Sequence, residues 1–341
     1  MIRLHPALFL ADLEAKPAAL RALAGHLAGG NPWAGLGTTG GNPWAGLGTT
    51  GGNPWAGLGT PGRVTFVGMG SSRYAALVAA RRLRLRGVDA SAEYASDVLP
   101  ALPGPLIAIS ASGTSRETLD AVAGRDYVAV TNVADSPLAK GATTVVPMHA
   151  GVEAGGVACR SFQHTLLLLD ALIRQLTGGD TAATGRLAER TAEATEDLLE
   201  RRDEWLPAVD ELLDGGDGVY AIAPVDRVSS ALQSALMVRE GPRRAADGCE
   251  TGDWAHVDVY LTKTLRYRAL LFPGSRYDEQ ALEWMRSRKS TVVSVGADVP
   301  GAAGTVRFRH DDVPDVRLTT ETLVAELVAA KWWERVAQTS P

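Results

Sequence analysis

Residues 107–118 decide the fold, and they read Ile-Ala-Ile-Ser-Ala-Ser-Gly-Thr-Ser-Arg-Glu-Thr. The apolar run that leads into them, Leu106–Ile109, follows a Pro-Gly-Pro segment and predicts a short buried strand. A turn around Gly113 comes next, and a helix is expected from about Glu117. Hydroxyl side chains crowd this turn and the start of the helix: Ser110, Ser112, Thr114, Ser115 and Thr118. We call residues 110–115 the hydroxyl cradle.

The hydroxyl cradle has the chemistry of a dianion site. Side-chain hydroxyls, together with backbone N–H groups left free at a helix start, suit a phosphate monoester. No lysine follows Gly113, so the Walker pattern of nucleotide triphosphate sites is absent. The alternative is that these Ser and Thr residues only cap the helix, but one or two hydroxyls would be enough for capping.

Composition excludes several classes of protein. The chain has 341 residues, is 45% hydrophobic and carries a net charge of −5, which argues against a nucleic-acid binder. Its two cysteines, Cys159 and Cys249, make neither a disulfide framework nor a zinc site. No H-x-x-x-H or C-x-x-C pattern occurs, and we expect no metal and no cofactor. We see no signal peptide and no apolar run long enough to span a membrane, so a cytoplasmic protein is expected.

Strand and helix patterns alternate on both sides of the hydroxyl cradle. Before it, the strand at 64–72 runs into a Gly-Ser turn, and after it an apolar helix is expected over 166–176. Such alternation predicts a parallel sheet covered on both faces, whose ligands bind beyond the carboxyl ends of the strands. The remaining elements expected in this half are helices at 17–27 and 73–86 and strands at 88–94, 127–132 and 144–147.

The second half of the chain repeats this plan. A charged helix at 186–202 leads to a strand at 219–224, a helix at 229–239, strands at 268–272 and 291–295, and a closing helix at 320–336. The segment that matches the cradle, residues 271–276, lacks its hydroxyls, so we expect one phosphate site per chain. The predicted fold is therefore α/β, with two tandem subdomains, each a flavodoxin-like three-layer sandwich whose mostly parallel sheet has helices on both faces.

An eleven-residue repeat interrupts the first half. Gly-Gly-Asn-Pro-Trp-Ala-Gly-Leu-Gly-Thr-Thr occupies 29–39, recurs at 40–50, and returns at 51–61 with proline at its end. The units are too short for a solenoid, and the simplest interpretation is a tolerated surface insertion. A lid or an oligomer contact is the functional alternative, because Trp33, Trp44 and Trp55 would otherwise be exposed aromatics.

These features together resemble the sugar isomerase (SIS) domain family, and most closely its double-SIS phosphosugar isomerases, deglycases and deaminases. The resemblance is carried by Gly70-Ser71-Ser72, by the Ser-x-Ser-Gly-x-Ser pattern at 110–115, by Thr131-Asn132, and by Ser136 to Ala139. It implies tandem SIS subdomains at 62–180 and 216–341, joined by a linking helix at 181–215. An N-terminal helical segment at 1–28 and the repeat at 29–61 precede them.

The resemblance also implies roles for individual residues. Residues 151–162 would form a loop that closes over the sugar, and Glu240 and His256 would be the catalytic base and the group that assists ring opening. The family forms dimers with interfacial sites, so a homodimer is expected. The phosphate ligands would be Ser72, Ser110, Ser112, Gly113, Thr114 and Ser115, and the remaining substrate contacts Gly70, Ser71 and Ala158.

Three departures from the family pattern stand out. A lysine one turn before the catalytic glutamate is Met237 here, and a glutamine in the cradle is Ala111. The C-terminal tail that carries a substrate-binding lysine has no counterpart after Trp333, and no N-terminal glutaminase domain is expected. We expect Arg239, Arg243 and Arg244 to supply the positive charge of the missing lysines. The alternative is that Glu240 is a surface carboxylate at the end of its helix, paired with Arg243 or Arg244.

The expected partner is a phosphorylated sugar, with no nucleic acid and no membrane. The sequence predicts an aldose–ketose isomerase or a deaminase or deglycase of an amino or ketoamine sugar 6-phosphate, which works by proton transfer without glutamine amidotransfer. The alternative is a non-catalytic sugar-phosphate sensor or regulatory paralogue. The missing lysines keep this alternative open.

Overall fold

The computed structural model describes residues 5–34, 63–100 and 104–339 and divides into two compact units. Residues 19–151 and 160–189 form one, which we call the β1–β5 unit; residues 1–18, 152–159 and 190–341 form the other, the β6–β10 unit. Helices α2 (Lys16–Gly29) and α7 (Ala182–Glu200) run across this division. Among the described residues, no helix is long and apolar enough to cross a membrane.

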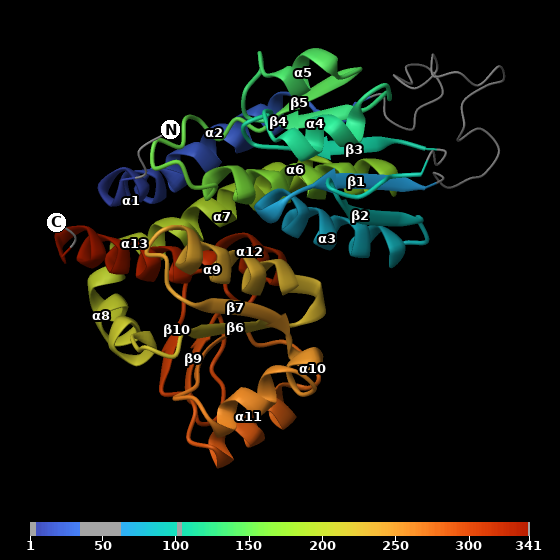
Figure 1. Cartoon of the computed structure of the whole chain (residues 1–341). Helices are drawn as coiled ribbons and strands as arrows, with labels where there is room; N and C mark the ends of the chain where they lie inside the picture. Colours follow the sequence, from blue (N-terminus) through green and yellow to red (C-terminus); the bar gives the residue numbers. More distant parts are fainter. Residues whose placement is uncertain (1–4, 35–62, 101–103, 340–341) are drawn as a thin grey trace. The chain divides into compact units, whose positions relative to one another are not determined.

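The β1–β5 unit is a parallel sheet in the order β2-β1-β3-β4-β5 (Figure 1). The strands on which the cradle depends are nearly all buried and β-branched or aliphatic, as expected of a sheet covered on both faces. Helices α3 and α6 pack against each other, while Val122 of α4 and Leu138 of α5 join the core beside Val67 and Ala108. The elements are β1 (Val64–Gly68), α3 (Gly70–Arg84), β2 (Ala90–Tyr94), β3 (Leu106–Ile109), α4 (Arg116–Val122), β4 (Val128–Thr131), α5 (Pro137–Gly141), β5 (Thr144–Pro147) and α6 (Arg160–Leu176).

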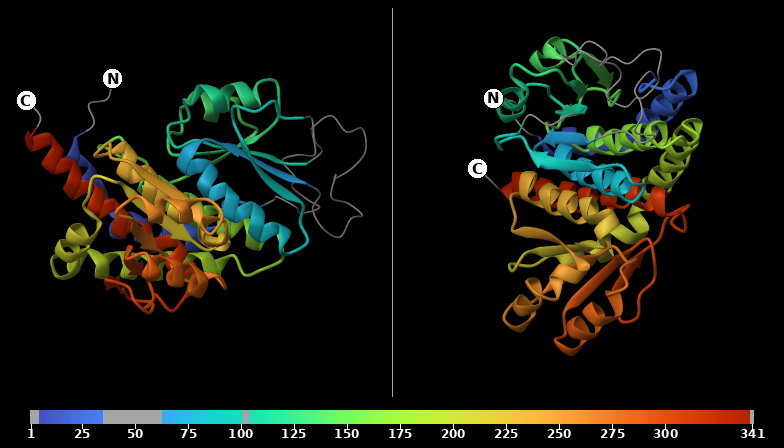
Figure 2. Two further views of the ribbon diagram at one scale, coloured as in Figure 1. Left: turned by 60° about the horizontal axis from the view of Figure 1, so that its bottom comes forward. Right: turned by 90° about the vertical axis from the view of Figure 1, so that its right-hand side faces the viewer.

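The β6–β10 unit repeats this topology with the order β10-β9-β8-β6-β7. Helices α9 and α13 pack on one face, and α10 and α11 contribute Trp254, Leu282 and Met285 to the core on the other (Figures 1 and 2). The elements are α1 (Pro6–Glu14), α8 (Arg202–Leu213), β6 (Val219–Ala223), the 3-10 turn η1 (Val225–Arg227), α9 (Val228–Glu240), β7 (Ala246–Glu250), α10 (Thr251–Trp254), the 3-10 turn η2 (Asp258–Lys263), β8 (Arg268–Leu271), α11 (Asp278–Ser287), β9 (Thr291–Val295), β10 (Gly304–Val306), α12 (Pro314–Thr320) and α13 (Thr322–Thr339).

Both units are therefore α/β sandwiches of helix, parallel sheet and helix, which confirms the predicted fold class. In each sheet the strand order reverses between the first strand and the third, at β1/β3 and at β6/β8. The crevice at such a reversal is where ligands bind in open α/β sheets. The cradle follows β3, at the reversal of the β1–β5 unit.

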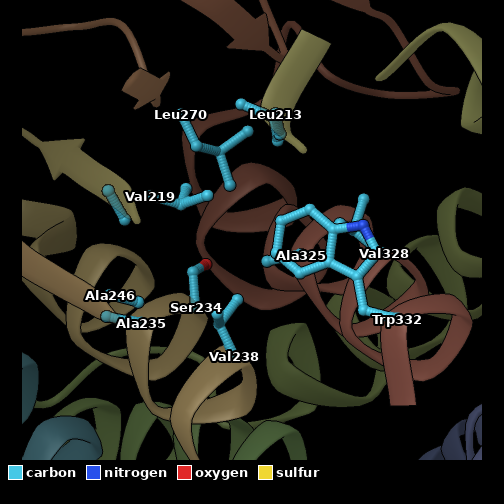
Figure 3. A pocket seen from close by; sticks show the side chains of 11 residues that line it. Leu213, Val219, Ser234, Ala235, Val238, Ala246, Leu270, Ala325, Val328 and Trp332 are labelled. Atoms are coloured by element: carbon cyan, nitrogen blue, oxygen red, sulfur yellow. The ribbon is translucent and has the colours of Figure 1, made fainter. Parts of the chain in front are cut away.

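A small apolar void lies under the second sheet (Figure 3). Side chains of β6, α9 and α13, with Leu213, Ala246 and Leu270, line about 10 Å³, the lower limit for one water molecule, and Ser234 offers the one hydroxyl of this lining. The Ser234 hydroxyl reaches this void and has no hydrogen-bond partner among the described residues. The Ser234 hydroxyl is therefore an unpaired polar group among apolar side chains.

The repeat at 29–61 lies outside the described residues except for its first six positions. Within these, Trp33 is fully buried and its indole Nε1 donates to the Leu168 carbonyl at 2.7 Å. Trp33 therefore gives no support to the lid or oligomer-contact alternative, because its ring is buried beside α6 without either. Trp44 and Trp55 fall outside the described residues.

Candidate functional site

The hydroxyl cradle connects the end of β3 to the start of α4. Its glycine, Gly113, has φ +62°, and a Cβ there would come within 2.1 Å of Ser136 Oγ and 3.0 Å of Thr131 Oγ1. The Gly113 N–H donates back to the Ser110 carbonyl at 3.1 Å. The turn therefore requires glycine, and Thr131 and Ser136 hold it from beneath.

The hydroxyls of the cradle divide into two groups. Ser115 is the N-cap of α4: its Oγ accepts from Thr118 N at 3.5 Å and donates to Glu117 Oε2 at 3.0 Å. Ser112 and Thr114 are exposed, and their hydroxyls bond to each other at 3.0 Å. Capping thus accounts for Ser115, while the exposed hydroxyls of Ser112 and Thr114 are not needed for it.

The Gly-Ser turn after β1 comes to the same edge of the sheet. Gly70 has φ +48°, and α3 starts there without a side-chain cap. A Cβ built on Gly68 would lie 3.0 Å from both Ser72 Cβ and the Ile109 carbonyl oxygen. Because Gly68 leaves this space open, Ser72 sits beside the end of β3, where the cradle begins. The structure thus brings Ser72 and Ser110 together, with Gly70 and Ser71 in the same turn.

Glu240 belongs to the β6–β10 unit and ends α9. Its carboxyl is partly buried, and desolvation, followed by the negative charge of Glu153, raises its pKa. Among the described residues it forms no ion pair: Arg244 binds Asp214 at 2.7 Å and lies over the Trp332 ring, while Arg239 Nε donates to the Ala235 carbonyl. The alternative that Glu240 is a surface carboxylate paired with Arg243 or Arg244 is therefore wrong, and Arg244 already pairs with Asp214.

The loop at 152–159 is fixed by contacts within the same unit. The Asp12 carboxylate accepts from Ala154 N at 3.2 Å and Gly155 N at 2.6 Å, and Glu153 Oε1 accepts from Cys159 N at 2.7 Å. The Ala158 carbonyl accepts from Gln233 Nε2 at 2.9 Å. The predicted loop at 151–162 is too long by three residues, because α6 already begins at Arg160.

Helix α9 carries both Glu240 and Gln233, the residue that binds the Ala158 carbonyl. Gln233, which binds the Ala158 carbonyl, precedes Glu240 by seven residues, or two helical turns, so both side chains leave the same face about 10 Å apart. The charge of Glu153 reaches Glu240 as well. Two of the predicted site residues, Ala158 and Glu240, therefore share one side of the β6–β10 unit. Sequence reasoning missed Glu153 and Gln233, although the i, i+7 spacing to Glu240 could have indicated Gln233.

His256 and Glu240 lie near opposite ends of strand β7. Helix α9 ends at Glu240 near the start of β7, whereas His256 follows the end of β7 and is exposed. The length of β7 alone separates them by about 13 Å at ~3.3 Å per residue. One chain therefore does not place the imidazole beside the carboxylate, and the expectation that the two act together would need His256 from another copy.

The loop after β8 is the counterpart of the cradle in the second sheet. Here Asp278, the first residue of α11, accepts from Gly274 N at 2.6 Å and Ser275 N at 3.0 Å through Oδ2. A carboxylate of the chain itself thus binds the backbone donors of this turn. Among the described residues, no group of three or more His, Cys, Asp or Glu side chains is placed to hold a metal ion.

Comparison with known proteins identifies the first half. The model of the SIS domain family matches residues 58–174, which include the cradle and the Gly-Ser turn. This part of the chain is therefore similar to a SIS domain. The chain is 28% identical over 211 residues to the glutamine–fructose-6-phosphate aminotransferase (isomerizing) of Aeropyrum pernix, an alignment that covers 57% of this chain and 34% of the relative. It thus spans about a third of that protein's length.

Solved structures extend the similarity of fold beyond the SIS domain. The tagatose-6-phosphate ketose/aldose isomerase of Escherichia coli superposes with a TM-score of 0.75 at 16% identity, covering 99% of this chain and 96% of that one. The glucosamine-6-phosphate deaminase of Thermotoga maritima gives a TM-score of 0.66 at 18% identity, covering 96% and 94%. At these identities the likeness establishes the fold, with two tandem SIS-like subdomains.

Proposed function

We propose that this protein acts on a sugar 6-phosphate, by aldose–ketose isomerisation or by release of an amine from an amino or ketoamine sugar. The observation that carries the proposal is Glu240, a partly buried carboxylate without an ion pair among the described residues, beside the fixed 152–159 loop. The hydroxyl cradle supplies the expected phosphate site. The names of the relatives, which include a ketose/aldose isomerase and a deaminase of sugar 6-phosphates, support the same two reactions.

Glu240 suits the proton transfer that both reactions need. Its carboxylate would take the proton from the carbon next to the carbonyl, which leaves an enediol or enamine intermediate, and would return the proton to the neighbouring carbon or promote loss of the amine. A raised pKa makes the carboxylate a stronger base at a pH where it is still ionised. The Ala158 carbonyl, held by Gln233, would help orient the sugar.

His256 enters this proposal only with a second copy of the chain. His256 and Glu240 of one chain lie near opposite ends of β7. The imidazole that assists ring opening would therefore come from the partner chain in a homodimer. The site would then be interfacial, with Glu240 from one copy and His256 from the other.

A sensor is the second candidate, and Met237 favours it. Met237 is fully buried and its Sδ lies 3.6 Å from Gln233 Nε2, so an uncharged core side chain stands one turn before Glu240. The family has a positively charged lysine at this position. A site that binds the phosphosugar without that lysine would recognise the ligand and leave it unchanged.

The deciding experiment follows hydrogen exchange in deuterated water. Fructose 6-phosphate, glucosamine 6-phosphate and a panel of fructosamine 6-phosphates are incubated with the protein, and NMR monitors deuterium at C1 and C2 and released amine. An enzyme incorporates deuterium or releases amine, and Glu240→Gln abolishes both, whereas Glu211→Gln, which removes an exposed carboxylate on α8, does not. Binding without exchange supports the sensor, and undiminished exchange in Glu240→Gln contradicts the role of this base.

A further inference from the structure

Arg73 is a cation beside the hydroxyl cradle that the proposed function does not use. It follows Ser72 in the first turn of α3, and its guanidinium carbon lies 3.6 Å from the centre of the Tyr94 ring. Its Nε is buried and has no hydrogen-bond partner among the described residues. Tyr94 is the last residue of β2, and its side chain is half exposed.

Several other arginines of the β1–β5 unit have carboxylate partners, while Arg84, Arg86 and Arg125 donate to backbone carbonyls. Arg82 and Arg174 contact Asp170, Arg63 lies 3.7 Å from Asp89, and Arg186 binds Asp180 at 2.6 Å. No carboxylate among the described residues pairs with Arg73, whose guanidinium contacts an aromatic ring instead. A planar guanidinium can stack on a ring with its face and still donate hydrogen bonds from its edge.

The register of the sheet places this cation close to the cradle. Tyr94 pairs with Gly68, the last residue of β1, and the Ile109 carbonyl lies directly on the other side of Gly68. These three residues form one row across β2, β1 and β3, about 10 Å long at a strand spacing of ~4.8 Å. Ser72 sits over the middle of the row and Ser110 follows its end.

The cradle itself lacks positive charge. Its side chains are hydroxyls, and the carboxylate nearest to them, Glu117, accepts from Ser115 and has a lowered pKa because of hydrogen bonds from its own backbone N–H and from that serine. A nearby cation would strengthen the binding of a phosphate dianion there, because it offsets the charge that neutral hydroxyls leave in place. The other arginine next to the cradle, Arg116, is almost fully exposed and lies 3.7 Å from Asp120.

We propose that Arg73, held on the Tyr94 ring, is the cation that binds the phosphate group of the ligand in the hydroxyl cradle. The guanidinium keeps its face on the ring and donates from its edge to a phosphate oxygen. This inference rests on the proposed function, because it takes the cradle to be a phosphate site. It makes the Arg73–Tyr94 pair a determinant of specificity for a charged phosphate ester over a neutral sugar.

The test measures binding of inorganic phosphate, fructose 6-phosphate and glucosamine 6-phosphate by calorimetry. Arg73→Gln is expected to weaken binding of each about 10- to 100-fold, as for loss of a charge-assisted hydrogen bond, and to reduce the dependence of Kd on salt. Tyr94→Phe keeps the ring and leaves Kd unchanged, whereas Tyr94→Leu removes the platform and weakens binding. Arg86→Gln removes the same charge two residues past the end of α3, whose last residue, Arg84, lies about 16 Å from Arg73 along the helix, and leaves Kd unchanged.

The outcomes separate this inference from the function on which it rests. If the unmodified protein binds none of the three probes, the phosphosugar function and the role of Arg73 both fail. If it binds them and Arg73→Gln binds equally well, the role of Arg73 fails and the function stands. A loss in Arg116→Gln but not in Arg73→Gln would assign the charge to α4 and overturn the proposal. Melting temperatures close to that of the unmodified protein exclude unfolding as the cause of a loss.

Discussion

A single carboxylate sets the pH range in which proton transfer can occur. Burial, and secondarily Glu153, raises the pKa of Glu240, so the ionised form is lost on acidification at a higher pH than for an exposed glutamate. Glu153→Gln removes the like charge, while its amide oxygen can still accept from Cys159 N. We expect the pKa of Glu240 to fall in this variant and the acidic limb of the pH–activity profile to move to lower pH.

Carboxyl titration by carbon-13 NMR checks this expectation without a substrate. The Glu240 resonance is assigned by its absence in Glu240→Gln, and its midpoint is compared with and without Glu153. An unchanged or higher midpoint in Glu153→Gln would show that the two carboxylates do not interact.

Ser234 offers a test of packing at one position. Its hydroxyl is buried without a partner among the described residues, beside the small void of Figure 3, and an unpaired buried polar group costs about 1–3 kcal/mol. We expect Ser234→Ala to raise the free energy of unfolding by about 1 kcal/mol, measured by urea denaturation. Ser294→Ala is the matched control, because Ser294 is buried on β9 but bonds to Thr305 at 2.9 Å, and its loss should destabilise. Destabilisation by both would mean that Ser234 is satisfied.

Among the elements, the 152–159 loop depends on one side chain of α1. Asp12 is buried and accepts the N–H groups of Ala154 and Gly155, so Asp12→Ala would leave two backbone donors without this acceptor. We expect hydrogen exchange at both amides to accelerate at least tenfold, with a smaller change in Asp12→Asn, whose amide oxygen still accepts. Unchanged exchange rates would mean that other contacts hold the loop.

The sequence predicts those elements whose cause is local. It predicts the cradle because the strand, the glycine turn and the capping serine follow one another between 106 and 118. It does not predict strand β7, which is an edge strand, Ala-Asp-Gly-Cys-Glu, without an apolar pattern. Helix α6 begins at Arg160 rather than Leu166, since its first turn buries polar residues such as Ser161 and Gln163 that periodicity assigns to the surface.

The rest of the candidate site required the fold. Asp12 and the loop that it fixes are about 140 positions apart, and Gln233 binds a carbonyl 75 positions before it. No local pattern predicts such pairs. Likewise, only the structure shows that strand β7 separates Glu240 from His256. Their spacing of sixteen residues, which matches the family pattern, does not reveal this.

At the scale of the whole molecule, the proposed interfacial site predicts that two inactive variants restore activity when they form a heterodimer. Glu240→Gln and His256→Ala homodimers should each be inactive in the exchange assay, whereas a mixture of the two, unfolded and refolded together, forms heterodimers with one intact site. About a quarter of the activity should return. No recovery in a mixture that has formed heterodimers would place both residues in the same copy's site or exclude His256.

The carboxylate of Asp278 makes the two sheets differ in how an added anion can affect their stability. In the second sheet a carboxylate of the chain accepts from the backbone donors of the turn after β8, whereas in the turn after β3 neutral hydroxyls accept from Gly113 N and Thr114 N, and Ser112 and Thr114 are exposed. Inorganic phosphate bound in the cradle would therefore stabilise the β1–β5 unit alone, whereas a sugar phosphate would in addition contact Ala158 and Glu240 of the β6–β10 unit and stabilise both. The duplicated fold would thus pair a turn that an added anion can enter with a turn in which the chain's own carboxylate already takes the place of the anion.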